Sequence, residues 1–210
     1  MKTTISLVRH GLVHNPNKIY YGRLTGFGLA DTGRAQVVLT GRFLANWPIA
    51  AVYHSPMQRA LETAEIIAAQ LPTPSPLIET EHLNEVYTRF DGWPETKMDE
   101  RGWDLYTGEQ PPYEQPNVVL ARLLAFFAQA LAAFPGQHVL GVTHGDLVNF
   151  AIQWGAGLPV QPKRNLVDEC GVEESYPSQA CVAMFDFEGE QLVGKSYHSP
   201  AKPRQSTQVG

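Results

Sequence analysis

Apolar residues along the chain follow two alternating patterns, short continuous runs and longer stretches with helical spacing. The continuous runs at residues 4–8, 49–53 and 138–142 predict buried strands, because they are short and contain many β-branched residues. Apolar residues three or four positions apart predict helices over residues 31–46, 55–70, 118–134 and 147–155. Residues 77–78 favour a brief strand, and residues 181–187 and 191–197 a closing hairpin.

Strands that alternate with helices over short connections are typical of the α/β class. We therefore predict an α/β three-layer sandwich with a mostly parallel central sheet, helices on both faces and an antiparallel edge in the last hairpin. Residues 1–200 would form a single domain and residues 201–210 a disordered tail. Residues 86–116 are irregular and rich in tryptophan, tyrosine and proline, which predicts a lid or a binding insert.

Local sequence signals indicate where two of the helices begin and which residues form the apolar stripe of the first. Asp31 is the expected N-cap of the first helix, and Ala35, Val38, Leu39 and Phe43 form its apolar stripe. In the second, Ser55 is the expected N-cap, with Pro56 at the first helical position. Residues 156–177 have no helical or strand period and predict a loop-rich stretch.

Composition narrows the class of protein. The 210 residues include 16 basic and 21 acidic side chains, a net charge of −5 that does not favour nucleic acid or anionic membranes as partners. The apolar stretch before Arg9 is too short for a secretory signal, and no later run approaches a membrane span. Cys170 and Cys181 suit neither a disulfide framework nor a metal site. A cytoplasmic protein is expected, and a homo-oligomer stays open.

Candidate chemistry gathers where predicted strands end. His10 and His144 follow the first and the fourth strand, and Arg59 lies in the first turn of the second helix. Ligands of open α/β sheets bind at this edge. Each residue alone has an ordinary structural explanation, but two imidazoles with Arg9 and Arg59 suit a bound dianion. A neutral imidazole is also a competent nucleophile toward phosphorus.

Four blocks of sequence resemble the histidine phosphatase superfamily, in its phosphoglycerate mutase-like branch (branch 1). They are Leu7-Val8-Arg9-His10-Gly11, residues 29–36 (Leu29 to Gln36), residues 55–64 (Ser55 to Ala64, around Arg59-Ala60) and Val142-Thr143-His144-Gly145. The resemblance implies that His10 attacks a phosphoryl group and that water then hydrolyses the phosphohistidine. It also implies that Arg9, Arg59 and His144 hold the phosphate oxygens, without metal or cofactor.

The same resemblance implies further site residues. Glu85, after Leu83-Asn84, matches the proton donor of the branch, and Glu81 and Asp91 are its rivals. Asn15 and the backbone of Gly22 are candidates for contact with phosphate. Arg23 would reach a second anionic group of the substrate or be solvated. The chain departs from the family at Leu12-Val13 and in the spacing after Glu85, which leaves the substrate open.

The favoured function is a phosphomonoesterase that hydrolyses a small phosphorylated metabolite. A phosphoglycerate mutase is the first alternative, but Gly145-Asp146-Leu147 lacks the basic residue that a mutase typically has after its second histidine. A non-catalytic phospho-ligand-binding module is the second. A metallohydrolase using the His10/His14 pair is disfavoured, because no set of carboxylate ligands lies near His14.

Overall fold

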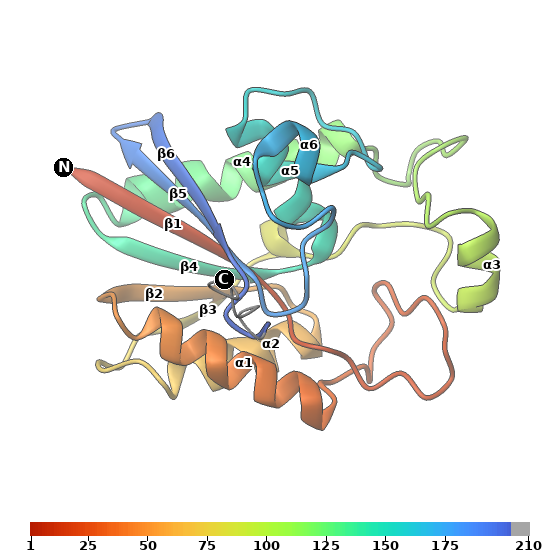
Figure 1. The fold of residues 1–210 in the computed structure, drawn as a ribbon, viewed down its shortest axis with the longest axis horizontal. Helices are drawn as coiled ribbons and strands as arrows, with labels where there is room; N and C mark the ends of the chain where they lie inside the picture. Colours follow the sequence, from red (N-terminus) through yellow and green to blue (C-terminus); the bar gives the residue numbers. More distant parts are fainter. Residues whose placement is uncertain (203–210) are drawn as a thin grey trace, which may run out of the picture.

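One six-stranded sheet organises the computed structural model, which describes residues 1–202 (Figure 1). The strands are β1 (Lys2–Arg9), β2 (Ile49–His54), β3 (Leu77–Glu79), β4 (His138–Thr143), β5 (Val182–Glu188) and β6 (Gln191–His198). They lie in the order β3-β2-β4-β1-β5-β6. The first four are parallel, whereas β5 runs antiparallel to β1 and β6 antiparallel to β5. The predicted sheet and its hairpin edge are confirmed.

Helices cover both faces of this sheet (Figure 1). On one face lie α1 (Asp31–Leu44) and α2 (Gln58–Ala68), and on the other α4 (Pro116–Ala133), α5 (Gly145–Gly155) and α6 (Leu166–Cys170). Successive residues of a strand point to opposite faces, so Val8 packs beneath α1 and α2 while Leu7 belongs to the larger cluster beneath α4 and α5. The three-layer α/β sandwich is confirmed.

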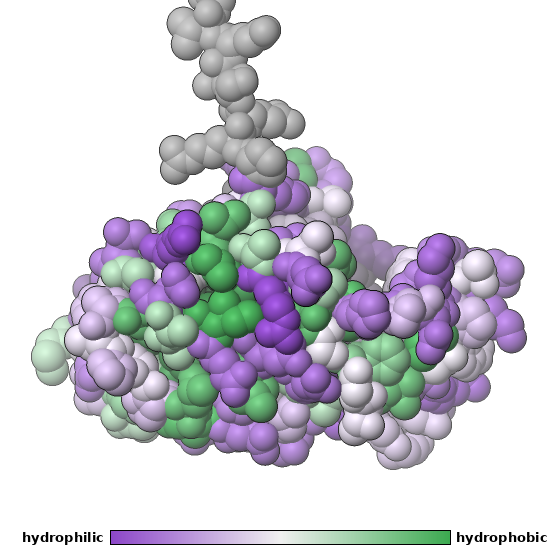
Figure 2. All heavy atoms as spheres, turned by 90° about the horizontal axis from the view of Figure 1, so that it is seen from below, coloured by the Kyte–Doolittle hydropathy of each residue, from purple (hydrophilic) through white to green (hydrophobic). Residues whose placement is uncertain are grey.

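The predicted apolar stripe of α1 is only partly buried: Phe43 packs against the core, whereas Ala35 and Leu39 are exposed. The buried residues are Gly33, Val37, Thr40, Gly41 and Leu44, and Leu39 is 44% exposed. Figure 2 views the molecule from below the α1–α2 layer and shows hydrophobic side chains scattered among hydrophilic ones on that face. The small glycines let α1 approach its neighbours closely, and buried Thr40 donates its hydroxyl to the carbonyl of Ala180. Polar and small residues therefore form part of the buried stripe.

The predicted N-caps also need correction. Ala30, not Asp31, caps α1, and Met57, not Ser55, caps α2, which begins at Gln58. The hydroxyl of Ser55 does accept a hydrogen bond from the backbone N–H of Met57. Its main contact, described below, lies in the site.

Helix α4 is long and apolar enough to cross a bilayer, with a mean hydropathy of 1.5 over its 18 residues. This corrects the expectation that no later run approaches a membrane span. Within the domain, α4 buries one stripe against the core that contains β1 and β4. The stripe consists of Val119, Leu123, Phe126, Phe127 and Ala130. A helix that packs into a core in this way is weak evidence for membrane insertion.

The tract of residues 86–116 is not a separate flap, because much of it packs into the main core. Phe90, Met98, Leu105 and Tyr106 join the cluster beneath α4, and α3 (Glu95–Glu100) lies within the tract. The tract runs beside the loop of residues 11–30 at one end of the molecule (Figure 1), where the Tyr20 N–H donates to the Trp93 carbonyl over 2.7 Å.

Two other irregular segments contain more order than their sequences indicate. The loop-rich stretch of residues 156–177 includes α6. Of the predicted tail, Ala201 packs against the α1–α2 core and Lys202 pairs with Glu174. The rest of the tail, residues 203–210, lies outside the described part of the chain.

Candidate active site

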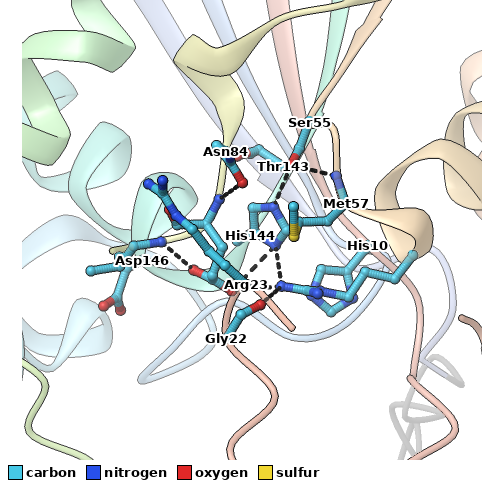
Figure 3. Close-up of polar contacts among 12 residues, drawn as sticks. His10, Gly22, Arg23, Ser55, Met57, Asn84, Thr143, His144 and Asp146 are labelled. Carbon is cyan, nitrogen blue, oxygen red and sulfur yellow. Dashed lines mark hydrogen bonds and ion pairs between the residues drawn. The ribbon is translucent and has the colours of Figure 1, made fainter. Parts of the chain in front are cut away.

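Three neighbouring parallel strands bring the candidate residues together at their carboxyl ends. His10 follows β1, Ser55 follows β2 and His144 follows β4 as the N-cap of α5. The register aligns Arg9 with Thr143 and His54 with Val142, so the strands end at nearly the same level. Figure 3 shows His10, Ser55 and His144 around one space at this edge of the sheet.

Arg59 joins these strand ends. Its side chain is 1% exposed, and its Nε lies 3.2 Å from Nε2 of His10. Its Nη2 lies 2.8 Å from the carbonyl oxygen of Gly22, 3.2 Å from Oε2 of Glu85 and 3.2 Å from Nδ1 of His144. The ring of Tyr21 covers the guanidinium at 4.8 Å. One buried cation therefore contacts every other candidate catalytic group.

His10 is held as a neutral imidazole whose Nε2 accepts a hydrogen bond from Nε of Arg59. Its Nδ1 lies 2.8 Å from the Gly11 carbonyl, which can only accept, so Nδ1 carries the proton and Nε2 offers its lone pair. Burial lowers the pKa of His10 well below its usual value, and the charges of Arg59, His144 and Arg9 lower it further. At neutral pH His10 is therefore in the form that can attack an electrophile.

His144 is fully buried. The hydroxyl of Ser55, the residue predicted to cap α2, orients the ring of His144 instead. Ser55 Oγ lies 2.8 Å from Nε2 of His144. Burial lowers the pKa of His144 to about 4, an effect that Glu85 opposes and Arg59 reinforces. The available signal for Ser55 was its place directly after a buried strand, the same position that His10 and His144 occupy.

Glu85 contacts Nη2 of Arg59, whereas His10 contacts its Nε. Oε1 of Glu85 accepts a hydrogen bond from the backbone N–H of Val86, and its Oε2 lies 3.2 Å from both Arg59 and His144. Burial alone would raise the pKa of Glu85, but contact with His144 and Arg59 outweighs burial and lowers it. Without substrate, Glu85 is a carboxylate.

Arg9 approaches the site from the β1 side. Its Nη1 donates to the Pro177 carbonyl over 2.6 Å, and the guanidinium lies 5.4 Å from the ring centre of Tyr176. Within residues 1–202 its buried Nε has no hydrogen-bond partner. A buried donor on a cation favours an incoming anion, because an unmet hydrogen bond of a charged group is costly.

The other residues predicted to contact the substrate, Asn15, Gly22 and Arg23, all bind protein groups in the free site. The Gly22 carbonyl binds Arg59, with Gly22 at φ 37°. The Asn15 amide donates to the Ile19 carbonyl and to Glu95, so its role as a phosphate ligand stays a prediction. Arg23 donates to the Glu85 carbonyl over 2.8 Å and pairs with Glu114 at 3.1 Å.

Three features near the site have no role predicted there from the sequence: the carboxylate of Asp146, the pair of tyrosines that binds it, and Tyr20. Asp146, in the first turn of α5, accepts hydrogen bonds from Tyr106 at 2.5 Å and Tyr176 at 2.7 Å. This carboxylate joins the tract of residues 86–116 to the loop before β5. Tyr20, discussed below, is the third. Tyrosines in irregular segments gave no periodic signal by which to find them.

The same geometry bears on metal binding. His10, Glu85 and His144 offer ligand atoms that lie within 4.8 Å of one another. Arg59 lies within 3.2 Å of an atom of each of these residues, so a metal ion there would have to displace or face a buried guanidinium. The buried guanidinium of Arg59 and the buried Nε of Arg9 fit an oxyanion better than a cation.

Comparison with known proteins agrees with the geometry. The profile of the histidine phosphatase superfamily (branch 1) matches residues 5–180. The uncharacterized protein Rv0525 of Mycobacterium tuberculosis is 34% identical, covering 95% of this chain and 98% of its own. The uncharacterized phosphatase PhoE of Bacillus subtilis is 29% identical, covering 80% of this chain and 86% of its own.

Solved structures share the fold. YhfR of Bacillus stearothermophilus superposes with a TM-score of 0.74 at 23% identity, covering 91% of this chain and 94% of its own. The mycobacterial glucosyl-3-phosphoglycerate phosphatase Rv2419c gives 0.72 at 18% identity, covering 94% and 97%. The sequence match over most of the chain, together with this fold and site, leads to one conclusion: the protein belongs to branch 1 of the histidine phosphatase superfamily.

Proposed function

We propose that this protein is a metal-independent phosphomonoesterase that hydrolyses a small phosphorylated metabolite through a phosphohistidine on His10. The observation that carries the proposal is the contact of His10 Nε2 with Arg59 Nε at 3.2 Å, inside a buried site. A phosphate that enters between them meets a neutral nucleophile on one side and a fixed guanidinium on the other. That arrangement supplies both attack and charge stabilisation.

The reaction proceeds in two transfers. The lone pair of His10 Nε2 forms a bond to phosphorus while the bond to the leaving oxygen breaks, and that oxygen takes a proton from Glu85. Water then attacks the phosphohistidine and gives a proton back to Glu85, which releases inorganic phosphate and restores neutral His10. Arg9, Arg59 and His144 hold the non-bridging oxygens through both steps.

Glu85 must gain a proton before it can serve as the acid. In the free site Arg59 and His144 favour its charged form. A bound phosphate dianion brings negative charge close to the carboxylate and draws on the same Arg59 donors. Both effects raise the pKa of Glu85 toward a useful range.

Hydrolysis is favoured over mutase chemistry. A mutase must retain a monophosphate and return the phosphoryl group to it, which calls for further cationic groups. Here Asp146 follows the second histidine, and its carboxylate is bound by two tyrosines instead.

The proposal is tested with p-nitrophenyl phosphate as substrate, with and without EDTA. We expect turnover that EDTA leaves unchanged, a complete loss with His10→Ala, and wild-type rates with His14→Ala, whose histidine is exposed in the following loop. A phosphohistidine should be trapped on the wild type by rapid acid-free quenching, since the N–P bond is labile in acid. Full activity in His10→Ala would overturn the mechanism, and inhibition by EDTA would overturn metal independence.

A further inference from the structure

Two buried polar atoms beside Arg59 have no partner within residues 1–202. They are the hydroxyl of Tyr20 and Oδ1 of Asp91. Both side chains flank Gly22: a Cβ built there would lie 1.8 Å from Asp91 Oδ1 and 3.0 Å from Tyr20 Cε1. Gly22 in turn binds Arg59 through its carbonyl (Figure 3). We call Tyr20, Gly22 and Asp91 the polar wall of the site.

The polar wall offers one donor and one acceptor. Burial raises the pKa of Tyr20 well above its usual value, and the nearby carboxylates of Glu85, Asp146 and Asp91 raise it further, so its hydroxyl keeps its proton. The other oxygen of Asp91 accepts from the Arg23 N–H over 3.0 Å, which leaves Oδ1 as the acceptor. An alcohol matches this pair, because one hydroxyl group accepts from a phenol and donates to a carboxylate.

The surrounding arginines are neutralised by glutamates. Glu114 pairs with Arg23 at 3.1 Å and with Arg122 at 2.7 Å. Glu109 pairs with Arg89 at 2.9 Å and lies 3.5 Å from Arg101. A second anionic group on the substrate would therefore meet the carboxylates near Tyr20 and would have to compete with Glu114 for Arg23.

We propose that the polar wall binds a hydroxyl group of the substrate, and that the preferred substrates are monophosphates of polyols or sugars without a second negative charge. This inference rests on the proposed phosphatase function and names its substrate class. Phosphate binds to Arg9, Arg59 and His144, and the hydroxylated carbon chain lies against Tyr20 and Asp91. A cationic substrate is a poorer match, because it cannot accept the hydrogen bond of Tyr20.

Four esters of similar size test the proposal: glycerol 3-phosphate, propyl phosphate, 3-phosphoglycerate and phosphoethanolamine. We expect kcat/KM for glycerol 3-phosphate to exceed that for each of the others by about tenfold, the effect of one hydrogen bond in a buried site. Tyr20→Phe and Asp91→Asn should bring the ratio of glycerol 3-phosphate to propyl phosphate close to one. Tyr113→Phe, the same change outside the site, should keep the wild-type ratio.

Calorimetric Kd values for the same esters, measured with the full-length His10→Gln variant, separate the two proposals. The same order of affinity without turnover in the wild type would overturn the phosphatase function and support the polar wall. Turnover in which propyl phosphate, 3-phosphoglycerate or phosphoethanolamine matches glycerol 3-phosphate would overturn the polar wall alone. An unchanged ratio in both Tyr20→Phe and Asp91→Asn would do the same.

Discussion

At the scale of single residues, Arg59 determines how the free site behaves. Its guanidinium contacts His10, Glu85 and His144, three groups that must act differently once substrate binds. Together with burial, the charge of Arg59 keeps His10 uncharged, and together with His144 it keeps Glu85 charged. The proposed reaction therefore begins with an exchange of partners, in which phosphate oxygens replace protein acceptors on Arg59.

Glu85→Gln tests the acid. We expect kcat/KM for an alkyl phosphate, which reports the first transfer alone, to fall by roughly 10²–10⁴-fold, the usual contribution of general acid catalysis. The loss for p-nitrophenyl phosphate should be much smaller, because nitrophenolate leaves without a proton. Glu81→Gln is the matched control, since Glu81 is bound by the side chain of Asn84 and should leave both rates near wild type. Equal losses on the two esters in Glu85→Gln would contradict the assignment.

Ser55→Ala tests the orientation of His144. Removal of the hydroxyl 2.8 Å from Nε2 leaves the ring free to rotate and its nitrogen unpaired. We expect kcat on p-nitrophenyl phosphate to fall about tenfold with a smaller change in KM. Ser75→Ala, which removes a hydroxyl that binds the distant Ile49 carbonyl, should not alter kcat. A change confined to thermal stability would show that Ser55 is only structural.

At the scale of elements, the loop after β1 and the start of α1 are fitted through glycine. A Cβ on Gly33 would lie 2.1 Å from the Leu12 carbonyl oxygen, and one on Gly11 2.7 Å from the Gly33 carbonyl oxygen. Backbone atoms cannot move aside as a flexible side chain would. This contact fixes the chain directly after His10 and so links the packing of α1 to the nucleophile.

Gly33→Ala should therefore cost about 1–3 kcal/mol of unfolding free energy, the range for overpacking a tight contact. Urea unfolding at constant pH measures the effect. Gly194→Ala in β6 meets its neighbours only at ordinary contact distance and should leave the free energy of unfolding within about 0.5 kcal/mol. Equal stability of the two variants would show that α1 can shift to accept the methyl group.

The sequence predicts this level of structure well where apolar residues carry the signal. The sequence predicts the three central strands, α4 and α5 because their buried positions are occupied largely by Val, Ile, Leu and Phe. It predicts α2 from Ala60, Ala64 and Ile67 at helical spacing. The buried face of α1 is not predicted in this way, because two of its residues are not apolar side chains. Gly33 allows close approach to Leu12, and Thr40 donates a hydrogen bond to the Ala180 carbonyl. In the site, motifs predict His10, Arg59 and Glu85, whereas the contact of Ser55 with His144 and the position of Tyr20 beside Gly22 arise only in the tertiary structure.

At the scale of the whole molecule, buried histidines make stability depend on pH. His138 is 7% exposed and lies 2.7 Å from Ser6 Oγ, away from the strand ends that carry the site. Burial lowers its pKa to about 4, against an ordinary value of 6.5. Below pH 6.5 His138 therefore binds a proton in the unfolded chain but not in the folded protein. The free energy of unfolding falls as the pH drops toward 4.

His138→Gln should remove one such proton. We expect the slope of unfolding free energy against pH between 6.5 and 4 to decrease by about 1.4 kcal/mol per pH unit, while activity on p-nitrophenyl phosphate is retained. Identical slopes in wild type and His138→Gln would mean that His138 titrates normally in the folded protein.

The central place of β1 has a consequence for synthesis. Strand β1, which is made before the other strands of this domain, pairs with β4 and β5, whose residues begin at His138 and Val182. Neither partner strand exists until most of this domain has been synthesised. Until then both edges of β1 are unpaired, and Arg9 and His10 are not yet positioned in the site. Such distant pairing slows folding and prolongs exposure of an apolar strand. A nascent chain that stalls before β5 would therefore leave β1 with one unpaired edge, which chaperones can bind.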